Sequence, residues 1–244
     1  MKQNKYDELD FFNAYAQMSR SIHGLKAAGE WHVLKELMPN LKDKRVLDLG
    51  CGYGWHCGYA ESNGAASVIG VDLSKKMLEK AQELHGSKNI SFLNKSIEEV
   101  TFPQSSFDVV ISSLALHYVK DYREVVHNVY DLLAEGGTFL FSVEHPIFTS
   151  RPEQDWYVNE KEEILHWPID SYQEEDRRET SFLTNDVVKY HRTISTYINE
   201  LIRAGFIIQA VEEPKPTEEA LKESVEMRDE LRRPMFLMVL VRKA

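Results

Sequence analysis

Residues 45–54 read Arg-Val-Leu-Asp-Leu-Gly-Cys-Gly-Tyr-Gly, and this stretch decides the fold. Its first half, Arg45–Leu49, is a short apolar run typical of a buried β-strand, and the glycines that follow mark a turn that opens a helix. Glycine adopts positive φ at low cost and lets a ligand approach the backbone closely. In an open α/β sheet, ligands bind beyond the carboxyl ends of the strands, where this turn would lie. The stretch therefore predicts a strand–turn–helix unit with a ligand site.

After this stretch, short apolar strands alternate with amphipathic helices. Helices are expected over Tyr53–Ser62, from Ser74 onward, and from an Asp121 cap to the glycine pair at 136–137. Strand, helix and strand at this spacing indicate βαβ units, in which a parallel sheet carries helices on both faces. We therefore expect an α/β fold with a seven-stranded, mostly parallel sheet whose last strand pair is antiparallel. The expected strands are Arg45–Leu49, Ser67–Val71, Ile90–Leu93, Phe107–Ser112, Thr138–Val143, Phe206–Val211 and Met235–Val241.

Two segments flank or interrupt this pattern. Residues 1–44 are expected to form an N-terminal helical cap with a bend indicated by Ser19–Gly24 and Ala27–Gly29, ahead of a main domain at 45–244. Glu144–Asn185 is rich in Pro, Trp, Tyr and charge and shows no period, which is typical of a lid or a substrate-binding insertion. We therefore expect a substrate lid at 144–185, inserted after the fifth strand. A helix is expected to follow it, from Asp186 to Gly205.

Composition limits the classes of partner. The chain has 244 residues and a formal net charge of −10, and an acidic chain lacks the basic field of a nucleic-acid groove. The N-terminus lacks the apolar core of a signal peptide, and the longest late apolar run, Met235–Val241, is too short to span a bilayer. Two cysteines, Cys51 and Cys57, make a poor zinc site. We expect a cytoplasmic protein without nucleic-acid, membrane or metal partners, of unspecified oligomeric state.

Two nucleotide cofactors compete for the glycine turn. A dinucleotide fold requires G-x-G-x-x-G, and its third glycine would fall at position 55, which is Trp55. The pattern is G-x-G-x-G instead, and Asp48 stands two residues ahead of it. A carboxylate there would repel a pyrophosphate but would attract a cationic amino acid moiety. These residues disfavour an NAD-dependent oxidoreductase.

The run Val46–Gly54 resembles the first motif of the class I S-adenosylmethionine-dependent methyltransferases, whose first turn packs against the methionine portion of the cofactor. Val71–Leu73 resembles the second motif, in which an acidic residue accepts hydrogen bonds from both ribose hydroxyls. Asp72 would have this role, since a carboxylate offers two acceptor oxygens to a vicinal diol; the alternative role for Asp72 is a helix cap. The resemblance covers about residues 45–143 and implies S-adenosyl-L-methionine as cofactor.

The resemblance also implies further cofactor contacts. Ser96 stands where many family members have an Asp that binds the adenine amino group, and its hydroxyl can accept the same bond. In similar small-molecule methyltransferases the leading helix folds over the cofactor, so Arg20 would pair with the cofactor's carboxylate; a surface position is the alternative. The implied cofactor-binding set is Tyr15, Arg20, Asp48, Gly50, Gly52, Asp72, Leu73, Ser96, Ile97 and Ser113.

The acceptor end of the site has candidate catalytic residues. An amine or a neutral hydroxyl acceptor would benefit from a base near neutral pH, and His117 and His145 follow the fourth and fifth strands, at the ligand edge of the sheet. The alternative for either histidine is a hydrogen-bonded residue behind the site or a surface residue. The insertion's aromatic residues would cap the acceptor or fill the insertion's own core; they are Trp156, Tyr157, Trp167 and Tyr172.

The methyltransferase resemblance also narrows the acceptor. The Asp/Asn-Pro-Pro-Tyr type of tetrapeptide, which in the family marks methylation of planar amino nitrogens, is absent after the fourth strand. The sequence therefore predicts a methyltransferase that moves a methyl group to an O or N atom of a small-molecule acceptor. The alternative is a non-catalytic S-adenosylmethionine-binding sensor or assembly module.

Overall fold

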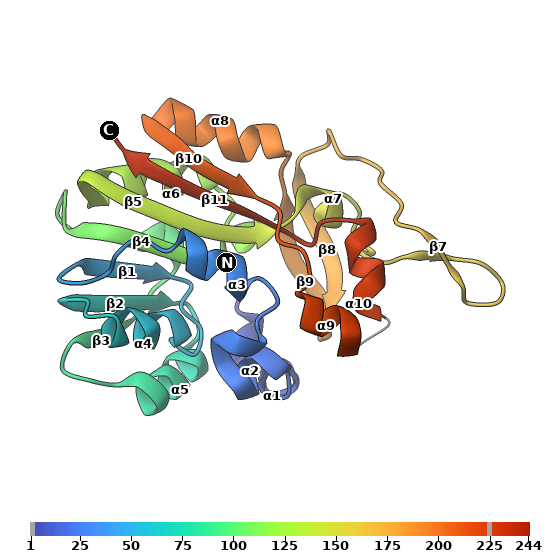
Figure 1. Cartoon of the computed structure of the whole chain (residues 1–244), viewed down its shortest axis with the longest axis horizontal. Coiled ribbons are helices and arrows are strands. Elements are labelled where there is room, and N and C mark those ends of the chain that lie inside the picture. Colours follow the sequence, from blue (N-terminus) through green and yellow to red (C-terminus); the bar gives the residue numbers. More distant parts are fainter. Residues whose placement is uncertain (1–2, 224–225) are drawn as a thin grey trace.

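The computed structural model describes residues 3–223 and 226–244, and a seven-stranded sheet forms its centre (Figure 1). The strand order is β10-β11-β5-β4-β1-β2-β3. Six strands run in the same direction, and β11 runs antiparallel to β10 and β5 on either side of it. The predicted mostly parallel sheet is thus confirmed. Its strands are β1 (Arg45–Leu49), β2 (Ser67–Asp72), β3 (Ile90–Asn94), β4 (Phe107–Ser113), β5 (Leu133–Glu144), β10 (Phe206–Glu212) and β11 (Phe236–Lys243).

Helices cover both faces of the sheet because successive strand residues point to opposite sides. Leu47 of β1 belongs to the larger apolar core, which α6 and α8 cover, whereas its neighbour Val46 faces the core under α4. The strand order reverses between β1 and β4, and such a switch point opens a crevice at the carboxyl ends of the strands. The helices are α3 (Trp31–Leu37), α4 (Trp55–Ser62), α5 (Lys75–His85), α6 (Tyr122–Leu132) and α8 (Ile194–Ala204), with short 3-10 turns η3 (Ile97–Glu99) and η4 (Leu116–Tyr118).

The N-terminal segment is helical, as predicted, and it turns within the two predicted stretches, at Gly24 and at Gly29. Most of the first stretch, Ser19–His23, is a short helix rather than an irregular bend. The chain turns at Gly24, which has φ +68°, and the Trp55 ring lies only 2.9 Å from where a Cβ atom would stand. Glycine is needed there for both reasons. The elements are η1 (Lys5–Asp7), α1 (Leu9–Ala16), α2 (Ser19–His23) and η2 (Gly24–Ala27).

The insertion after β5 is present, and it has more secondary structure than predicted. It holds two antiparallel hairpins, and the β6–β7 hairpin projects from the body of the molecule (Figure 1). Arg232, near the C-terminus, donates a hydrogen bond of 2.5 Å to the Leu165 carbonyl of that hairpin. The elements after β5 are α7 (Pro146–Thr149), β6 (Tyr157–Val158), β7 (Ile164–His166), β8 (Asp176–Phe182) and β9 (Thr184–His191). Between β10 and β11 lie α9 (Glu218–Glu223), α10 (Glu226–Asp229) and η5 (Glu230–Arg232).

The helix predicted from Asp186 is wrong in its first half. Thr184–His191 is strand β9, paired with β8, and α8 begins only at Ile194. Burial alternates along β9, where Val187, Lys189 and His191 point inward, so tertiary contacts favour period two over the helical period. The predicted end of α6 at the glycine pair 136–137 is also wrong, because the helix ends at Leu132 and β5 already includes both glycines.

The corrected start of α8 can be tested by mutation. The Thr193 hydroxyl accepts a hydrogen bond of 3.2 Å from the Thr196 amide and therefore caps the helix. We expect Thr193→Ala to lower the free energy of unfolding by about 1 kcal/mol, measured by urea denaturation. The matched control is Asp186→Asn, which should change stability little because no helix begins there and Asn tolerates its positive φ of 60°. The opposite ranking of the two variants would contradict the assignment.

Candidate functional site

The glycine turn lies at the carboxyl edge of the sheet and is bonded to the neighbouring strand. The amides of Gly50 and Cys51 both donate to the Val71 carbonyl, at 2.8 and 2.9 Å. Gly50 has φ +77°, and a Cβ atom there would lie 2.3 Å from the Cβ atom of Ala115. Only glycine fits this position, because the segment after β4 packs directly against the turn.

Asp72 ends β2 and is bonded to the same turn. Its Oδ2 atom accepts from the Gly52 amide and its Oδ1 atom accepts from the Ser74 amide, both at 2.9 Å. The carboxylate lines a cavity, and each oxygen keeps a lone pair for a further donor. Burial raises its pKa, against the effect of these two bonds. Asp72 is therefore a rigidly held double acceptor, and α5 takes its side-chain cap from Ser74 instead.

Asp48 lies behind the turn rather than in the cavity wall. Its Oδ2 atom accepts a bond of 3.4 Å from the Cys57 thiol, and its Oδ1 atom has no partner among the described residues. Burial raises its pKa to about 7. Asp48 therefore does not contact the cavity directly, and the turn lies between its carboxyl group and the cavity.

The cavity has a volume of about 1010 Å³ and runs from the glycine turn to the β8–β9 hairpin. Most of the residues predicted from the sequence to bind a ligand meet in its wall, although they come from six separate segments. Asp48 and His145 do not line it. The predicted residues that do are Tyr15, Arg20, Gly50, Gly52, Asp72, Leu73, Ser96, Ile97, Ser113 and His117.

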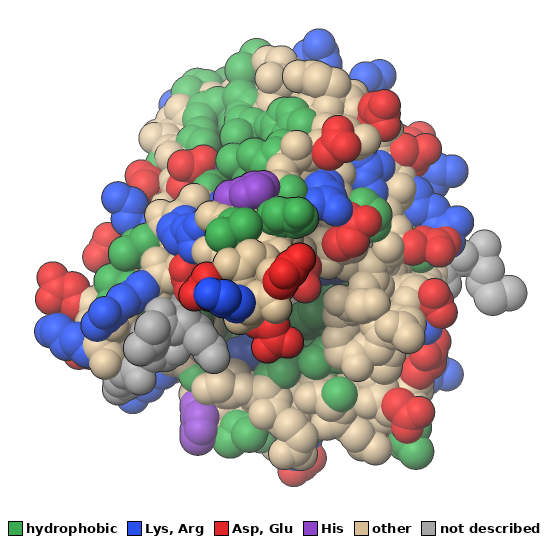
Figure 2. Space-filling model, turned by 90° about the vertical axis from the view of Figure 1, so that its right-hand side faces the viewer, with side chains coloured by type: hydrophobic (Ala, Val, Ile, Leu, Met, Phe, Trp, Pro, Cys, Tyr) green, Lys and Arg blue, Asp and Glu red, His purple; other side chains and the backbone are tan. Residues whose placement is uncertain are grey.

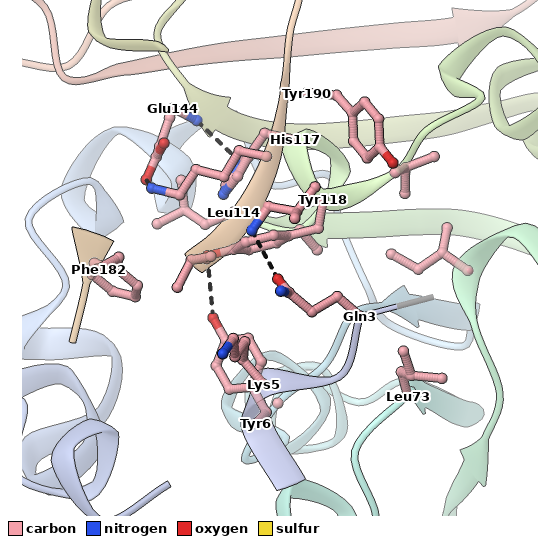
Figure 3. Close-up of a pocket in the computed structure, with 18 of the residues that line it drawn as sticks. Gln3, Lys5, Tyr6, Leu73, Leu114, His117, Tyr118, Glu144, Phe182 and Tyr190 are labelled. Atoms are coloured by element: carbon pink, nitrogen blue, oxygen red, sulfur yellow. Dashed lines mark hydrogen bonds and ion pairs between the residues drawn. The ribbon is translucent and has the colours of Figure 1, made fainter. Parts of the chain in front are cut away.

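The N-terminal segment closes one side of this cavity (Figure 3). Asn4 donates to the Leu73 carbonyl at 3.3 Å, and Gln3 makes two hydrogen bonds to the backbone of β9. Arg20 forms an ion pair of 3.2 Å with the buried Glu30, which fixes its guanidinium at the cavity wall. The segment thus joins the sheet edge to the insertion.

A polar network that the sequence did not reveal lies at the other end of the cavity. Lys189 of β9 is 1% exposed and forms an ion pair of 2.6 Å with Glu144. Gln154 bonds to both partners, accepting from Lys189 at 2.9 Å and donating to Glu144 at 3.1 Å. All three line the cavity. The sequence offers no signal for this network, because Thr184–His191 does not alternate apolar and polar residues and its alternating burial is seen only in the structure.

His117 stands beside this network in the cavity wall. Its Nδ1 atom accepts from the Glu144 amide at 3.4 Å, as drawn in Figure 3. Burial lowers its pKa to about 4, so the ring is neutral at pH 7. Leu114, three residues before His117, has φ +53°. This is a strained conformation of the kind that clusters at functional sites.

The geometry gives His145 a structural role. Its side chain is fully buried, its Nδ1 atom accepts from the Ile147 amide at 3.0 Å, and its Nε2 atom lies 2.8 Å from Glu213. Both ring nitrogens are thus engaged outside the cavity, and His145 caps α7. We therefore do not assign it a chemical role.

The four predicted aromatic residues of the insertion do not line the cavity. Trp156 and Trp167, with Phe148, surround the guanidinium of Arg233 from the C-terminal segment, at 4.0–5.0 Å from their ring centroids. Tyr172 packs at 5.5 Å against His191 of β9, and Tyr157 is 55% exposed. Three of the four thus pack against neighbouring segments, and Tyr157 has neither predicted role in this structure.

Within the described ranges, no cluster of three or more His, Cys, Asp or Glu side chains is arranged to hold a metal ion. None of the helices in those ranges has the length and apolar composition needed to cross a membrane.

Comparison with known proteins identifies the family. A model for the methyltransferase domain matches residues 47–141. A Listeria monocytogenes protein whose structure is described as an S-adenosylmethionine-dependent methyltransferase is 49% identical, with a TM-score of 0.86 over 91% of this chain and 99% of its own. The chain belongs to the S-adenosylmethionine-dependent methyltransferases. A Mesorhizobium loti methyltransferase of the same description is 42% identical (TM-score 0.84; 90% and 100% of the chains), and an uncharacterized Haemophilus influenzae protein is 37% identical over 98% and 96%.

The residues of this methyltransferase fit S-adenosylmethionine as cofactor. The glycine turn leaves no room for a Cβ atom at position 50, and Asp72 offers two acceptor oxygens at the cavity wall. The unpartnered Oδ1 atom of Asp48 places negative potential behind the turn, which suits a cationic ligand.

The buried charge of Asp48 makes a prediction for the methyltransferase without cofactor. A folded-state pKa of about 7 is above the ordinary value, so the ionised form is disfavoured and stability is lost as pH rises from about 4 through 7. We expect Asp48→Asn to remove this loss, so that its stability relative to the wild type increases by about 3 kcal/mol between pH 5 and pH 8. Urea unfolding at the two pH values measures it, and a pH-independent difference would contradict the assignment.

Proposed function

We propose that this methyltransferase moves a methyl group from S-adenosylmethionine to an O or N atom of a small-molecule acceptor. The observation that carries the proposal is one continuous cavity of about 1010 Å³, from the glycine turn to the β8–β9 hairpin. Ligand pockets typically measure about 300–1,000 Å³. The cavity is therefore large enough for the cofactor and a second small molecule together.

The cofactor end is assigned to the residues around the glycine turn. Asp72 would accept hydrogen bonds from the ribose, because its two oxygens are held at the cavity wall by the Gly52 and Ser74 amides. Arg20 would meet the cofactor's carboxylate, with Tyr15 beside it in the wall. The adenine would lie against Ile97 and Ser96, and the remaining assigned contacts are Gly50, Leu73 and Ser113, with Asp48 acting through its charge.

The chain's own contribution to the reaction is position and exclusion of water. S-adenosylmethionine supplies a methyl group on a cationic sulfur when it is bound. Holding an acceptor atom about 3–3.5 Å from the reacting carbon provides much of the rate. Residues 1–44 would act as a cap and residues 144–185 as a lid, since Gln3 bonds to β9 at 2.6 and 2.7 Å across the cavity mouth.

The charge pattern supports a small acceptor in cytoplasmic metabolism rather than a nucleic acid. The chain carries a net charge of −10, and acidic and basic side chains are interspersed on the face shown in Figure 2. Nucleic-acid binding requires a basic patch or stripe that can meet several phosphates.

Substitution of Asp72 tests the cofactor end. We expect Asp72→Asn to weaken S-adenosylmethionine binding by at least about 10-fold, because hydrogen bonds to a charged group contribute about 1.5–3 kcal/mol each. Isothermal titration calorimetry measures it. The control is Asp108→Asn on the same sheet, whose carboxylate pairs with Arg45 at 2.9 Å at the amino end of β4, and which should bind normally. Equal affinities of the wild type and Asp72→Asn would overturn the assignment.

The acceptor class can be tested with methyl-labelled S-adenosylmethionine. We expect label to enter the small-molecule fraction of a cell lysate and not total tRNA or protein supplied in parallel. Label in tRNA or protein would contradict the small-molecule proposal. Absence of label from every pool, with normal cofactor binding, would contradict the proposal altogether and favour a binding module.

A further inference from the structure

The acceptor end of the cavity has more hydrogen-bond donors than free acceptors. Glu144 is satisfied at both oxygens, by Lys189 at 2.6 Å and by Gln154 at 3.1 Å. The carbonyl oxygen of Gln154 accepts from Lys189 and from Thr180, at 2.9 and 3.0 Å. The ammonium group of Lys189 carries three protons and uses two of them within the described residues. One donor of a 1% exposed cation is thus left over in the cavity wall.

His117 supplies a second donor. Because its Nδ1 atom accepts from the Glu144 amide, the neutral ring carries its proton on Nε2. No partner of Nε2 is found in the described part of the chain, although the residue is only 2% exposed and lines the cavity. In this tautomer His117 donates a hydrogen bond to a ligand and does not accept a proton from it.

Neither ionisable neighbour at this end is a strong base among the described residues. Burial lowers the pKa of His117 to about 4. Burial would raise the pKa of Glu144, but the Lys189 ion pair and the hydrogen bonds from Lys189 and Gln154 hold it below its ordinary value. The best acceptor for such a site is a group that is already ionised, and therefore nucleophilic, near neutral pH.

The ion pairs around the cavity leave no net positive field. Lys5, Arg20 and Arg177 line the cavity, but they pair with Glu8, Glu30 and Glu179, which lie outside its wall. The case for an anionic ligand therefore rests on the remaining donors of Lys189 and His117.

We propose that the methyl acceptor is a carboxylate on an apolar body, held by Lys189 and His117, and that the product is its methyl ester. The inference rests on the proposed function and narrows it to one acceptor class. The apolar body would contact Phe182 and the fully buried Val187 of the β8–β9 hairpin, with Phe236 and Phe148 beside them in the wall.

The reaction balances without a base. A carboxylate oxygen forms the new bond to the methyl carbon while the carbon–sulfur bond breaks and its electron pair stays on sulfur. The negative charge of the acceptor and the positive charge on sulfur are both neutralised, and no proton is transferred. Lys189 and His117 would orient the carboxylate without taking part in bond making.

The type of bond that the transferred methyl group forms distinguishes the carboxylate acceptor from the broader proposal of O- or N-methylation. The wild-type protein is incubated with methyl-labelled S-adenosylmethionine and the small-molecule fraction of a lysate, and the products are then treated with mild alkali. Methyl esters release labelled methanol, which is volatile, whereas methyl ethers and N-methyl groups do not. We expect most of the label to become volatile. Alkali-stable products would overturn the carboxylate acceptor and keep the proposed function, and no labelled product would overturn both.

Substitutions at His117 test its donor role. We expect His117→Leu to raise the KM for the acceptor that becomes the methyl ester by about 10-fold or more, because the variant loses one hydrogen bond to a charged group. His117→Gln should recover much of the loss, because an amide donates a hydrogen bond but is no base. The exposed His127→Leu on α6 is the matched control and should behave as wild type. Equal losses in the Gln and Leu variants would contradict the donor role.

Substitutions at Lys189 need a second change to keep the fold intact. Lys189→Met alone would leave Glu144 buried and unpaired, so the test uses Lys189→Met with Glu144→Gln, which removes both charges. We expect this double variant to bind S-adenosylhomocysteine as wild type does by calorimetry, and to lose ester formation by about 10-fold or more. Unchanged ester formation would overturn the role of Lys189.

Discussion

The hydrogen bond that the Gly52 amide donates to Asp72 joins the ends of the first two strands, and the rest of the site depends on it. It requires β1 and β2 to be parallel neighbours in the register observed, with Leu49 opposite Val71. It also requires the left-handed backbone of the glycine turn, against which Ala115 packs. One bond therefore couples the sheet register, the turn and the segment after β4. A slip of one residue in β2 would point Asp72 to the opposite face of the sheet.

Two carboxylates at opposite ends of the site, Glu144 and Asp48, are compensated to different degrees. Glu144 is compensated by Lys189 and Gln154, so the pair is neutral, and one proton of Lys189 has no hydrogen-bond partner among the described residues. Asp48 has a thiol partner and one oxygen without any, so its burial is a cost to the folded protein. A cationic ligand beyond the turn would offset that cost. The buried Asp48 carboxyl group thus lowers the stability of the ligand-free protein, and a cationic ligand bound beyond the turn would restore that stability.

The walls of the cavity come from segments that are anchored by few, specific contacts. The insertion is fixed to the C-terminal segment by Arg233, whose guanidinium lies among three aromatic rings. The N-terminal segment is fixed to β9 by Gln3 and to the end of β2 by Asn4. None of these anchoring residues belongs to the apolar core of the sheet.

The sequence by itself determined the seven strands, the mostly parallel sheet with its antiparallel last pair, and the glycine turn, because hydrophobic period, caps and turn residues are local signals. The order of the strands in the sheet came only from the structure. It placed Gly50, Gly52 and Asp72 correctly at the cavity wall. Only the tertiary structure decided that β9 is a strand, that Lys189 is a buried partner of Glu144, and that His145 is a helix cap while His117 lines the cavity. These outcomes depend on contacts between residues tens of positions apart. A short stretch such as 184–191 has no local pattern strong enough to fix its conformation, so its partners in space decide it.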